Sequence, residues 1–483
     1  MVNQKRQFRR TTLLIWFFVG CLVGLAAARR LSLHSWLVVA LAGIISLSLF
    51  SRRQVVSLLA VILFGGLLGL WRGTGYMKRL QAYQQFWQQT VVMTAEAQSD
   101  AVYGYNSQLD FEVAGAQLLK PWPANLAGKI KVDGFGAPMV YRGDQLEITG
   151  KLRPTRGSAQ AKMSYAKIQL LAHKKSAVDD VRRRFIAGMQ SDLPEPEASF
   201  GAGLLIGQRS TIPKATNDEL SATGLTHLVA VSGYNLTIII IAVRKLLGRM
   251  SKFQSTVAAY TLMFLFVIVT GLSASIVRAA MVSSLSLLAW YYGRAVRPLL
   301  LISWAAALTA LWQPFYLWAD IGWYLSFLAF FGVLVLAPLM EKIARRFGNP
   351  PSLVLLLCET VSAQVMTLPI IMYIFGRLSL IGLVSNLMVV PLVPLAMLAS
   401  LLAGLAGMLI ASWAGWLAWP AKWLLTYMLN VTSLLSQLPH AATYQAISAA
   451  TMISLYVLIL MIAWRTTTKL KTMKDRSERR DMV

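Results

Sequence analysis

Residues 223–240 read TGLTHLVAVSGYNLTIII, and this stretch joins two opposite kinds of sequence. Its second half is as apolar as a membrane-crossing helix. Its first half carries His227, Ser232 and Asn235, which are costly to place in hydrocarbon. The apolar half assigns the stretch to a membrane. The polar residues within it are by default a hypothesis of a functional site.

The composition of the whole chain agrees with a membrane protein. Of its 483 residues, 56% are hydrophobic and 14% are charged, whereas soluble domains have roughly a quarter charged residues. The chain is therefore predicted to be a polytopic α-helical membrane protein. We expect about twelve crossings, some of them re-entrant, from apolar windows long enough to span the hydrocarbon. These windows lie near residues 11–28, 31–50, 54–71, 224–243, 254–272, 275–292, 298–313, 322–340, 352–375, 379–408, 412–438 and 444–464.

The net charge of +26 predicts the orientation. If the N-terminus is cytoplasmic, most Lys and Arg residues of the short loops and of both tails fall on the cytoplasmic side, as the positive-inside rule requires. We therefore expect a multi-pass protein of the cell (cytoplasmic) membrane with both termini in the cytoplasm. A cleaved signal peptide is the alternative for the first window, but its removal would invert this charge bias.

Four regions follow from these windows and charges. They are N-terminal transmembrane helices (1–71), an extracytoplasmic insert (72–198), a transmembrane core (199–465) and a basic cytoplasmic tail (466–483). The insert alternates apolar and polar residues as strands do, with Gly, Pro and Asn between the alternating segments. Several short strands in about 100 residues predict a small OB-like β-barrel. The expected strands are 109–119, 128–135, 144–152 and 166–173.

The second half of the insert is basic. From Lys151 to Arg184, only Asp179 and Asp180 oppose a series of Lys and Arg residues. Such a face fits a polyanion, and it fits anionic lipid headgroups equally well. The candidates for contact with a polyanion are Lys151, Arg153, Arg156, Lys162, Lys174 and Lys175.

Few ionisable residues lie in the predicted crossings. Arg278 and Glu359 lie within crossings, and Asp320 borders one. Two hypotheses stay open for Arg278 and Glu359, a structural ion pair between helices or a place on a pore. Residues 193–224 are too short and too polar to cross, so we expect them to lie along the outer membrane surface.

The sequence contains no recognisable metal or nucleotide motif. The four histidines lack metal-ligand spacing, both cysteines lie in apolar windows, and no phosphate-binding loop motif occurs. His227 and Ser232 would lie about 140° apart on a helix, which is poor for a base and a nucleophile. We therefore expect no metal, no cofactor and no enzymatic activity, with an intramembrane hydrolase as the less favoured alternative. A transporter of a small anionic solute, which also uses broken helices, is the main alternative.

Several ordered motifs resemble the ComEC family of competence proteins. They are GLLIGQRS (203–210), ATGLTHLVAVSGYNL (222–236), TGLSASIVRAAM (270–281), DIGWYLSFLA (320–329), AQVMTLPI (363–370) and FGRLSLIGLVSNLMVVPLV (375–393). The resemblance implies a channel that passes single-stranded DNA through the lipid bilayer into the cytoplasm during natural transformation. It also implies a separate DNA receptor, a nuclease, and a cytoplasmic helicase or ssDNA-binding protein as partners.

The resemblance also nominates residues for the DNA path, to which Glu359 is added because it lies inside a crossing. They are Gly207, Arg209, Ser210, Thr223, Gly224, His227, Ser232, Gly233, Asn235, Arg278, Asp320, Ser326, Glu359, Pro369 and Asn386.

The chain departs from the family pattern at Gln208, Tyr234, Asn235 and Tyr324. Many relatives carry a C-terminal metallo-β-lactamase-like domain. This sequence has no HxHxDH motif, so we expect the nuclease to be a separate protein.

Overall fold

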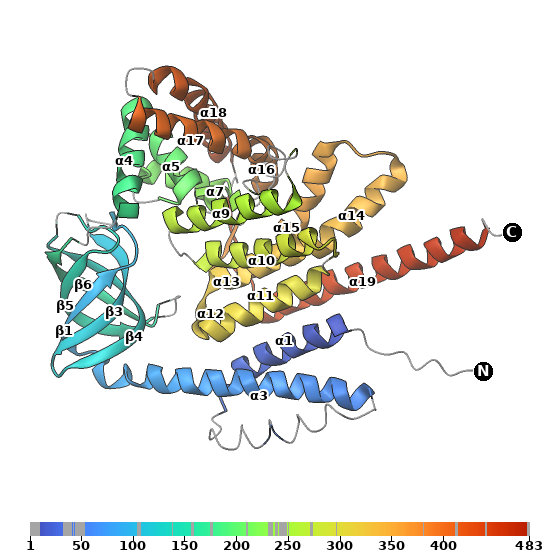
Figure 1. Ribbon diagram of the computed structural model, residues 1–483, viewed down its shortest axis with the longest axis horizontal. Helices are drawn as coiled ribbons and strands as arrows, with labels where there is room; N and C mark the ends of the chain where they lie inside the picture. The colour runs from blue at the N-terminus through green and yellow to red at the C-terminus, as the bar shows by residue number, and fades with distance from the viewer. Residues whose placement is uncertain are drawn as a thin grey trace.

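In the computed structural model of the chain, a small β-barrel lies at one end of a larger helical domain (Figure 1). The structure describes all residues except 1–9, 32–40, 42, 44–53, 104–107, 138, 156–158, 174–176, 209–210, 230–234, 237–239, 241–248, 250, 271–273, 296, 380, 411–413, 440–441 and 481–483.

Five of the strands close into the barrel. β1 pairs with both β3 and β5, so the order β1-β5-β6-β4-β3 returns to its start, and the short β2 extends the sheet beside β3. All pairs are antiparallel except β4 with β6. The predicted small barrel is confirmed, although β1 is absent from the prediction. The strands are β1 (Thr90–Ala97), β2 (Val102–Tyr103), β3 (Leu109–Lys120), β4 (Ala124–Phe135), β5 (Gln145–Pro154) and β6 (Ala161–Ala172).

Side chains fill the barrel interior. Because successive residues of a strand point to opposite faces, the apolar residues of the alternating pattern gather inside. Met93, Ile130, Ile148 and Met163 are fully buried there. The barrel therefore has a hydrophobic core of its own, separate from those of the helices.

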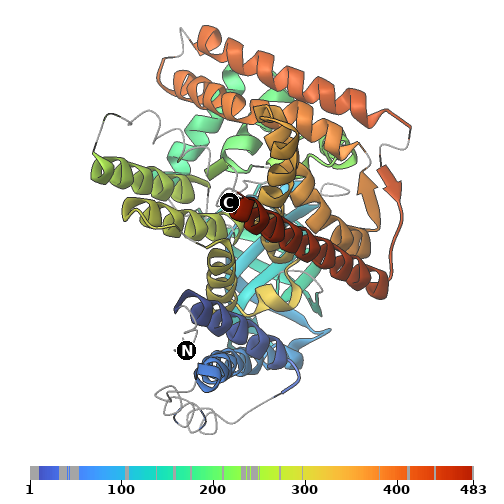
Figure 2. The ribbon, with the colours of Figure 1, turned by 90° about the vertical axis from the view of Figure 1, so that its right-hand side faces the viewer.

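The helical domain contains the described α-helices. Figure 2 shows α1 and α3 (blue) at one side of this domain and α17 and α18 (orange) at the other. The helices are α1 (Arg10–Ala27), α3 (Gln54–Gln81), α4 (Ala177–Asp192), α5 (Glu197–Ile206), α6 (Lys214–Ala222), α7 (Thr226–Val229), α9 (Lys252–Thr270), α10 (Ala274–Tyr291), α11 (Pro298–Trp312), α12 (Phe315–Ala319), α13 (Ile321–Phe331), α14 (Ala337–Ala344), α15 (Ser352–Phe375), α16 (Gly382–Val389), α17 (Val393–Leu409), α18 (Ala414–Ser436) and α19 (Ala449–Arg480).

Short elements complete the domain. A π-helical segment (Gly332–Leu336) joins α13 to α14, and single turns of 3₁₀-helix occur at Gln84–Phe86, Arg345–Phe347 and Val390–Leu392. Two short antiparallel strands, β7 (Arg377–Ser379) and β8 (Ala442–Tyr444), connect distant parts of the chain.

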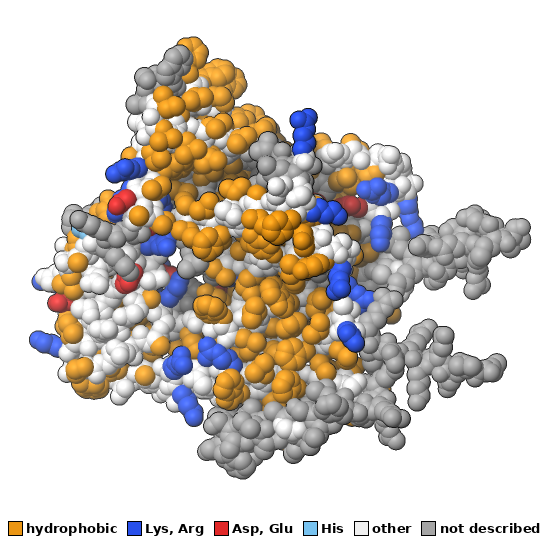
Figure 3. Space-filling model, viewed as in Figure 1, with side chains coloured by type: hydrophobic (Ala, Val, Ile, Leu, Met, Phe, Trp, Pro, Cys, Tyr) orange, Lys and Arg blue, Asp and Glu red, His pale blue; other side chains and the backbone are white. Residues whose placement is uncertain are grey.

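Seven described helices are long and apolar enough to cross a membrane, and the chain is a multi-pass membrane protein. They are Arg10–Ala27, Val55–Phe86, Lys252–Thr270, Ile321–Phe347, Ser352–Phe375, Gly382–Leu409 and Ala449–Lys469. Large apolar side chains cover much of the helical surface in Figure 3, and Phe264, Leu398 and Trp464 are each more than half exposed. Such a surface suits contact with lipid and would be unusual in water.

Five of the twelve apolar windows found in the sequence do not correspond to any of these seven helices. Residues 275–292 and 298–313 form the shorter apolar helices α10 and α11, and 412–438 forms α18. Most of 31–50 and much of 224–243 lie outside the described residues. Among the described residues, seven helices are thus long and apolar enough to cross, and the expectation of twelve crossings stays a prediction.

Helix α5 lies inside the helical domain, so the prediction that residues 193–224 lie along the membrane surface is wrong for this part. All ten residues of α5 are buried, and the helix packs against α17 and α18. Its sequence, EASFGAGLLI, is apolar or small around almost its whole circumference. A helix of that kind is buried on all sides rather than placed at an interface.

Glycines bring α1 and α3 into close contact. Gly24 of α1 lies against the backbone of Gly66 of α3, and Gly65 and Gly69 of α3 lie against the backbone of Cys21. A Cβ on Gly69 would overlap the Cys21 carbonyl oxygen. Gly20 lies four residues before Gly24, as Gly65 does before Gly69, and this small-residue pattern lets membrane helices approach closely.

This contact predicts that Gly69→Leu separates α1 from α3. Overpacking of this kind costs about 1–3 kcal/mol or more, so the purified protein should unfold at a lower temperature. Gly75→Leu is the matched control, because Gly75 lies on the same helix and a Cβ there meets nothing within 4 Å. Equal melting temperatures for the two variants would contradict the packing described.

Candidate functional site

The turn after α6 lies against a polar segment from much later in the chain. Thr223 is fully buried at the end of α6, and its carbonyl accepts a hydrogen bond of 2.7 Å from the Ser385 hydroxyl. The Ser379 hydroxyl donates to the Ala222 carbonyl at 2.9 Å. Two of the nominated motifs, 222–236 and 375–393, are therefore joined directly.

Gly224 and His227 extend this joint. Gly224 has φ +75°, a left-handed conformation that favours glycine, and its nearest neighbours include Gly382 and Ser379. Nδ1 of His227 lies 3.0 Å from the Gly224 carbonyl oxygen. Since a carbonyl only accepts, this ring nitrogen donates, and His227 helps to shape the turn.

Asn235 links the stretch at 223–240 to α5. It is 1% exposed, and its Nδ2 donates to the Leu204 carbonyl at 2.9 Å. Gly207 ends the same helix with φ +70°. The polar residue at the start of this crossing therefore satisfies a backbone carbonyl of a buried helix. The nominated Arg209, Ser210, Ser232 and Gly233 lie outside the described residues.

Two further candidates lie on α15 and α16. Asn386 follows Ser385 on α16, and its enclosed Oδ1 has no hydrogen-bond partner among the residues that the structure describes. Pro369 is buried within α15. Gln364 of α15 places its side-chain amide near Gly382, so polar groups continue from the joint toward α15.

Arg278 and Asp320 form a second site between α10 and α13. The Arg278 side chain is 2% exposed, and its Nη2 donates to the Gly322 carbonyl at 3.1 Å. Nε and Nη1 have no acceptor within the described part of the chain. Asp320 caps α13 by accepting from the Trp323 backbone N–H at 3.2 Å.

The hypothesis of an ion pair between Arg278 and Glu359 is wrong. Arg278 faces the start of α13, whereas Glu359 is exposed on α15, and neither forms an ion pair between described residues. Ser326 lies partly buried on α13. The nominated residues thus separate into the joint at Thr223, the Arg278 site and the isolated Glu359.

Ion pairs neutralise one face of the barrel. Lys129 pairs with Glu112 at 2.9 Å, and Lys131 pairs with Asp110 at 2.8 Å, across β3 and β4. Burial lowers the pKa of the Lys129 ammonium group, but the Glu112 carboxylate, with smaller contributions from Tyr316 and Asp320, outweighs burial and leaves that pKa raised. Among the candidates for DNA contact, Lys162 is also paired, with Asp133.

The adjoining face keeps its positive charge. Lys151 and Arg153 of β5 are exposed, as is Lys167 of β6, and none of the three forms an ion pair in the part of the chain described. Tyr165 on β6 is 78% exposed. This basic face, on β5 and β6, could contact a polyanion. Arg156, Lys174 and Lys175 lie outside the described residues.

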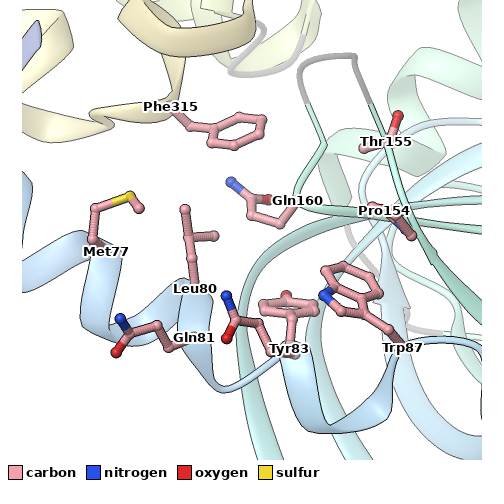
Figure 4. Close-up of a pocket in the computed structure, with 10 residues that line it drawn as sticks. Met77, Leu80, Gln81, Tyr83, Trp87, Pro154, Thr155, Gln160 and Phe315 are labelled. Atoms are coloured by element: carbon pink, nitrogen blue, oxygen red, sulfur yellow. The ribbon is translucent and has the colours of Figure 1, made fainter. Parts of the chain in front are cut away.

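Two polar joints hold the barrel on the helical domain. At the first, the Tyr76 hydroxyl of α3 accepts from the side-chain amides of Gln160, at 2.7 Å, and Gln313, at 3.0 Å. Beside it lies a cavity of about 200 Å³. In Figure 4, Phe315 and Leu80 line this cavity from the helices, and Trp87 and Pro154 line it from the barrel side. This volume is below the range usual for ligand pockets.

The second joint links the barrel to α4. Arg182 of α4 is 9% exposed and pairs with Asp100 of the barrel at 3.1 Å. The other Asp100 oxygen accepts from the Arg142 backbone N–H at 3.0 Å. Sequence reasoning missed both joints, because a single Tyr on a helix and single Gln and Asp residues in loops form no pattern. It also missed Ser379 and Ser385, although hydroxyls at the start of an apolar window were a visible signal.

The fold and sites define a multi-pass membrane protein that carries a β-barrel on one side of its helices. Residues 204–469 match the family described as Competence protein. This match covers more than half of the chain, so the chain belongs to that family, and the resemblance to ComEC proteins is confirmed.

A relative and the solved structures complete the comparison. The chain is similar to ComE operon protein 3 of Bacillus subtilis (strain 168), with 25% identity over 219 residues. The aligned part covers 45% of this chain and 27% of that protein, so the chain spans about a quarter of the relative it matches. No solved structure matches the chain.

The joint at Thr223 predicts that Ser385→Ala destabilises the protein. The change leaves the buried Thr223 carbonyl without its donor, which costs about 1–3 kcal/mol. Thermal unfolding of the purified protein measures this loss. Ser326→Ala is the control, since no hydrogen bond of the Ser326 side chain involves a described residue. If Ser385→Ala melts at the temperature of this control, the hydroxyl does not hold the two motifs together.

Proposed function

We propose that this protein conducts single-stranded DNA across the cell membrane into the cytoplasm during natural transformation. Membership of the competence family supports a role in DNA uptake. In this proposal the barrel lies outside and guides the strand, and the helical domain conducts it. A separate receptor, nuclease and cytoplasmic helicase or strand-binding protein act with it, and the chain itself catalyses no reaction.

The orientation and further crossings are part of the proposal. α1 begins, and α19 ends, on the side of the helical domain away from the barrel (Figure 1). Both termini in the cytoplasm and the barrel outside agree with this arrangement and with the positive-inside rule. The shorter helices α10 and α11, and α18 with its 23 residues, would then cross together with the seven long helices.

The observation that carries the conduit proposal is the Arg278 guanidinium. A buried arginine with two nitrogens that lack an acceptor among the described residues is costly in a membrane domain. Such residues commonly serve a substrate pathway. An anionic phosphate passing between α10 and α13 would supply the missing acceptors. The Asp320 carboxylate nearby keeps the local charge balanced, so the strand could be released again.

The barrel supports guidance of the strand. Its closed five-stranded order, with one parallel pair, agrees with the OB-like topology expected from the sequence. OB-type barrels bind single strands with cations along the backbone and aromatic rings against bases. The exposed Lys151, Arg153 and Tyr165 provide both kinds of group.

We predict that deleting the gene abolishes delivery of labelled DNA to the cytoplasm, and that Arg278→Gln fails to restore it. Arg278→Lys should restore part of the uptake because it keeps the charge. Arg294→Gln, which removes an exposed cation beyond the end of α10, should restore all of it. Normal delivery in the deletion strain would refute the conduit. Flux of small anions without DNA transport in liposomes would favour the solute transporter.

The basic face predicts a specific salt dependence. For the full-length protein in nanodiscs, Lys151→Gln with Arg153→Gln should weaken oligonucleotide binding. The slope of log affinity against log salt should fall by about 1.4, at about 0.7 for each lost phosphate contact. The control removes two other exposed cations, Lys78 and Arg79 of α3. The same loss of slope in both double variants would mean that the strand does not bind specifically to the basic face of the barrel.

A further inference from the structure

A second cavity lies where the barrel meets α4 and the loop after α5. Its volume is about 260 Å³, and we call it the arginine crevice. Three arginines line it, Arg142 from the barrel and Arg182 and Arg183 from α4, together with Asp100 and Asp179. Figure 3 shows blue and red side chains gathered where the barrel adjoins the helices. Arg182 pairs with Asp100 and Arg183 pairs with Asp180, whereas Arg142 forms no ion pair among the described residues.

Four side chains of this crevice carry an enclosed polar atom that lacks a hydrogen-bond partner among the described residues. The atoms are Arg142 Nη1, Arg182 Nε, Gln208 Oε1 and Thr211 Oγ1. They come from three separate segments of the chain. Buried polar groups are normally paired, so four such atoms around one cavity are suited to bind a polar ligand.

The chemistry of these groups favours an anion with several oxygens. Asp100 does not satisfy them in the structure, where it accepts from Arg182 Nη2 and from the Arg142 backbone N–H. Arg142 Nη1 and Arg182 Nε can only donate. The Thr211 hydroxyl can also donate, and the Gln208 amide can do so after rotation by 180°. Two guanidinium groups that converge with neutral donors are suited to phosphate oxygens.

We propose that the arginine crevice binds a phosphodiester of the strand as the strand passes from the barrel to the helical domain. This inference rests on the proposed function. The crevice includes residues of both domains, since Arg142 belongs to the barrel and Gln208 directly follows the end of α5. Binding here would hold the backbone and leave the bases free, so the site would accept any sequence.

The test uses the full-length protein in nanodiscs and an abasic strand, which has the sugar-phosphate backbone without bases. Arg142→Gln should weaken binding of this strand by about tenfold and lower the salt slope by about 0.7. Thr211→Val should weaken binding less and leave the slope unchanged. Arg184→Gln is the control, because Arg184 is exposed on α4 and does not line the crevice.

The backbone N–H of Arg142, which bonds to Asp100, is retained in Arg142→Gln, so we expect this variant to fold. Unchanged affinity and slope in Arg142→Gln would overturn the inference and leave the crevice filled by water. Loss of co-purified anionic phospholipid with unchanged strand binding would also overturn it, in favour of a lipid headgroup. In either case the wild type would still bind and transport DNA. Normal DNA delivery in the deletion strain would instead refute the proposed function itself.

Discussion

The arrangement of the whole molecule depends on one shared hydroxyl group. Tyr76 lies near the end of α3, and its oxygen accepts hydrogen bonds from Gln160 of the barrel and Gln313 at the end of α11. These three residues come from parts of the chain separated by up to 237 residues. Because the group is largely enclosed, water cannot readily replace either amide. The barrel is therefore seated on the helices in one position, with the ion pair between Asp100 and Arg182 as a second attachment.

The polar residues at and below this attachment fall into two kinds. With the barrel held at two points, the arginine crevice lies at the second attachment. Within the helices, the joint at Thr223 and the Arg278 site are different in kind. The hydroxyls of Ser379 and Ser385 are fully used in holding two segments together. Arg278 keeps nitrogens without acceptors in the described structure. Polar groups of the first kind build the domain, and those of the second kind are available to a substrate.

Much of the fold could be predicted because apolar windows and strand alternation are local signals. β3, β4, β5 and β6 were recognised from their alternation. The burial of α5 was missed, although its sequence is apolar or small around almost the whole helix, which is typical of a helix buried on all sides. The predicted ion pair of Arg278 was wrong for a different reason. A sequence shows which residues are charged but not which helices face each other, and the backbone carbonyl of Gly322 has no sequence signal at all. The motif at 222–236 did indicate a region that the fold brings together with 375–393.

The closed barrel has a geometric consequence for anything that it handles. Five strands leave an interior occupied entirely by the barrel's own side chains, such as Met93 and Met163. Nothing can be threaded along its axis, so a polymer must lie along the outside. The outer surface of the barrel places no limit on the width of a polymer that binds to it. Hairpins, protein-bound segments or bulky dyes could therefore be held at the barrel, and selection by size would fall to the helices beneath it.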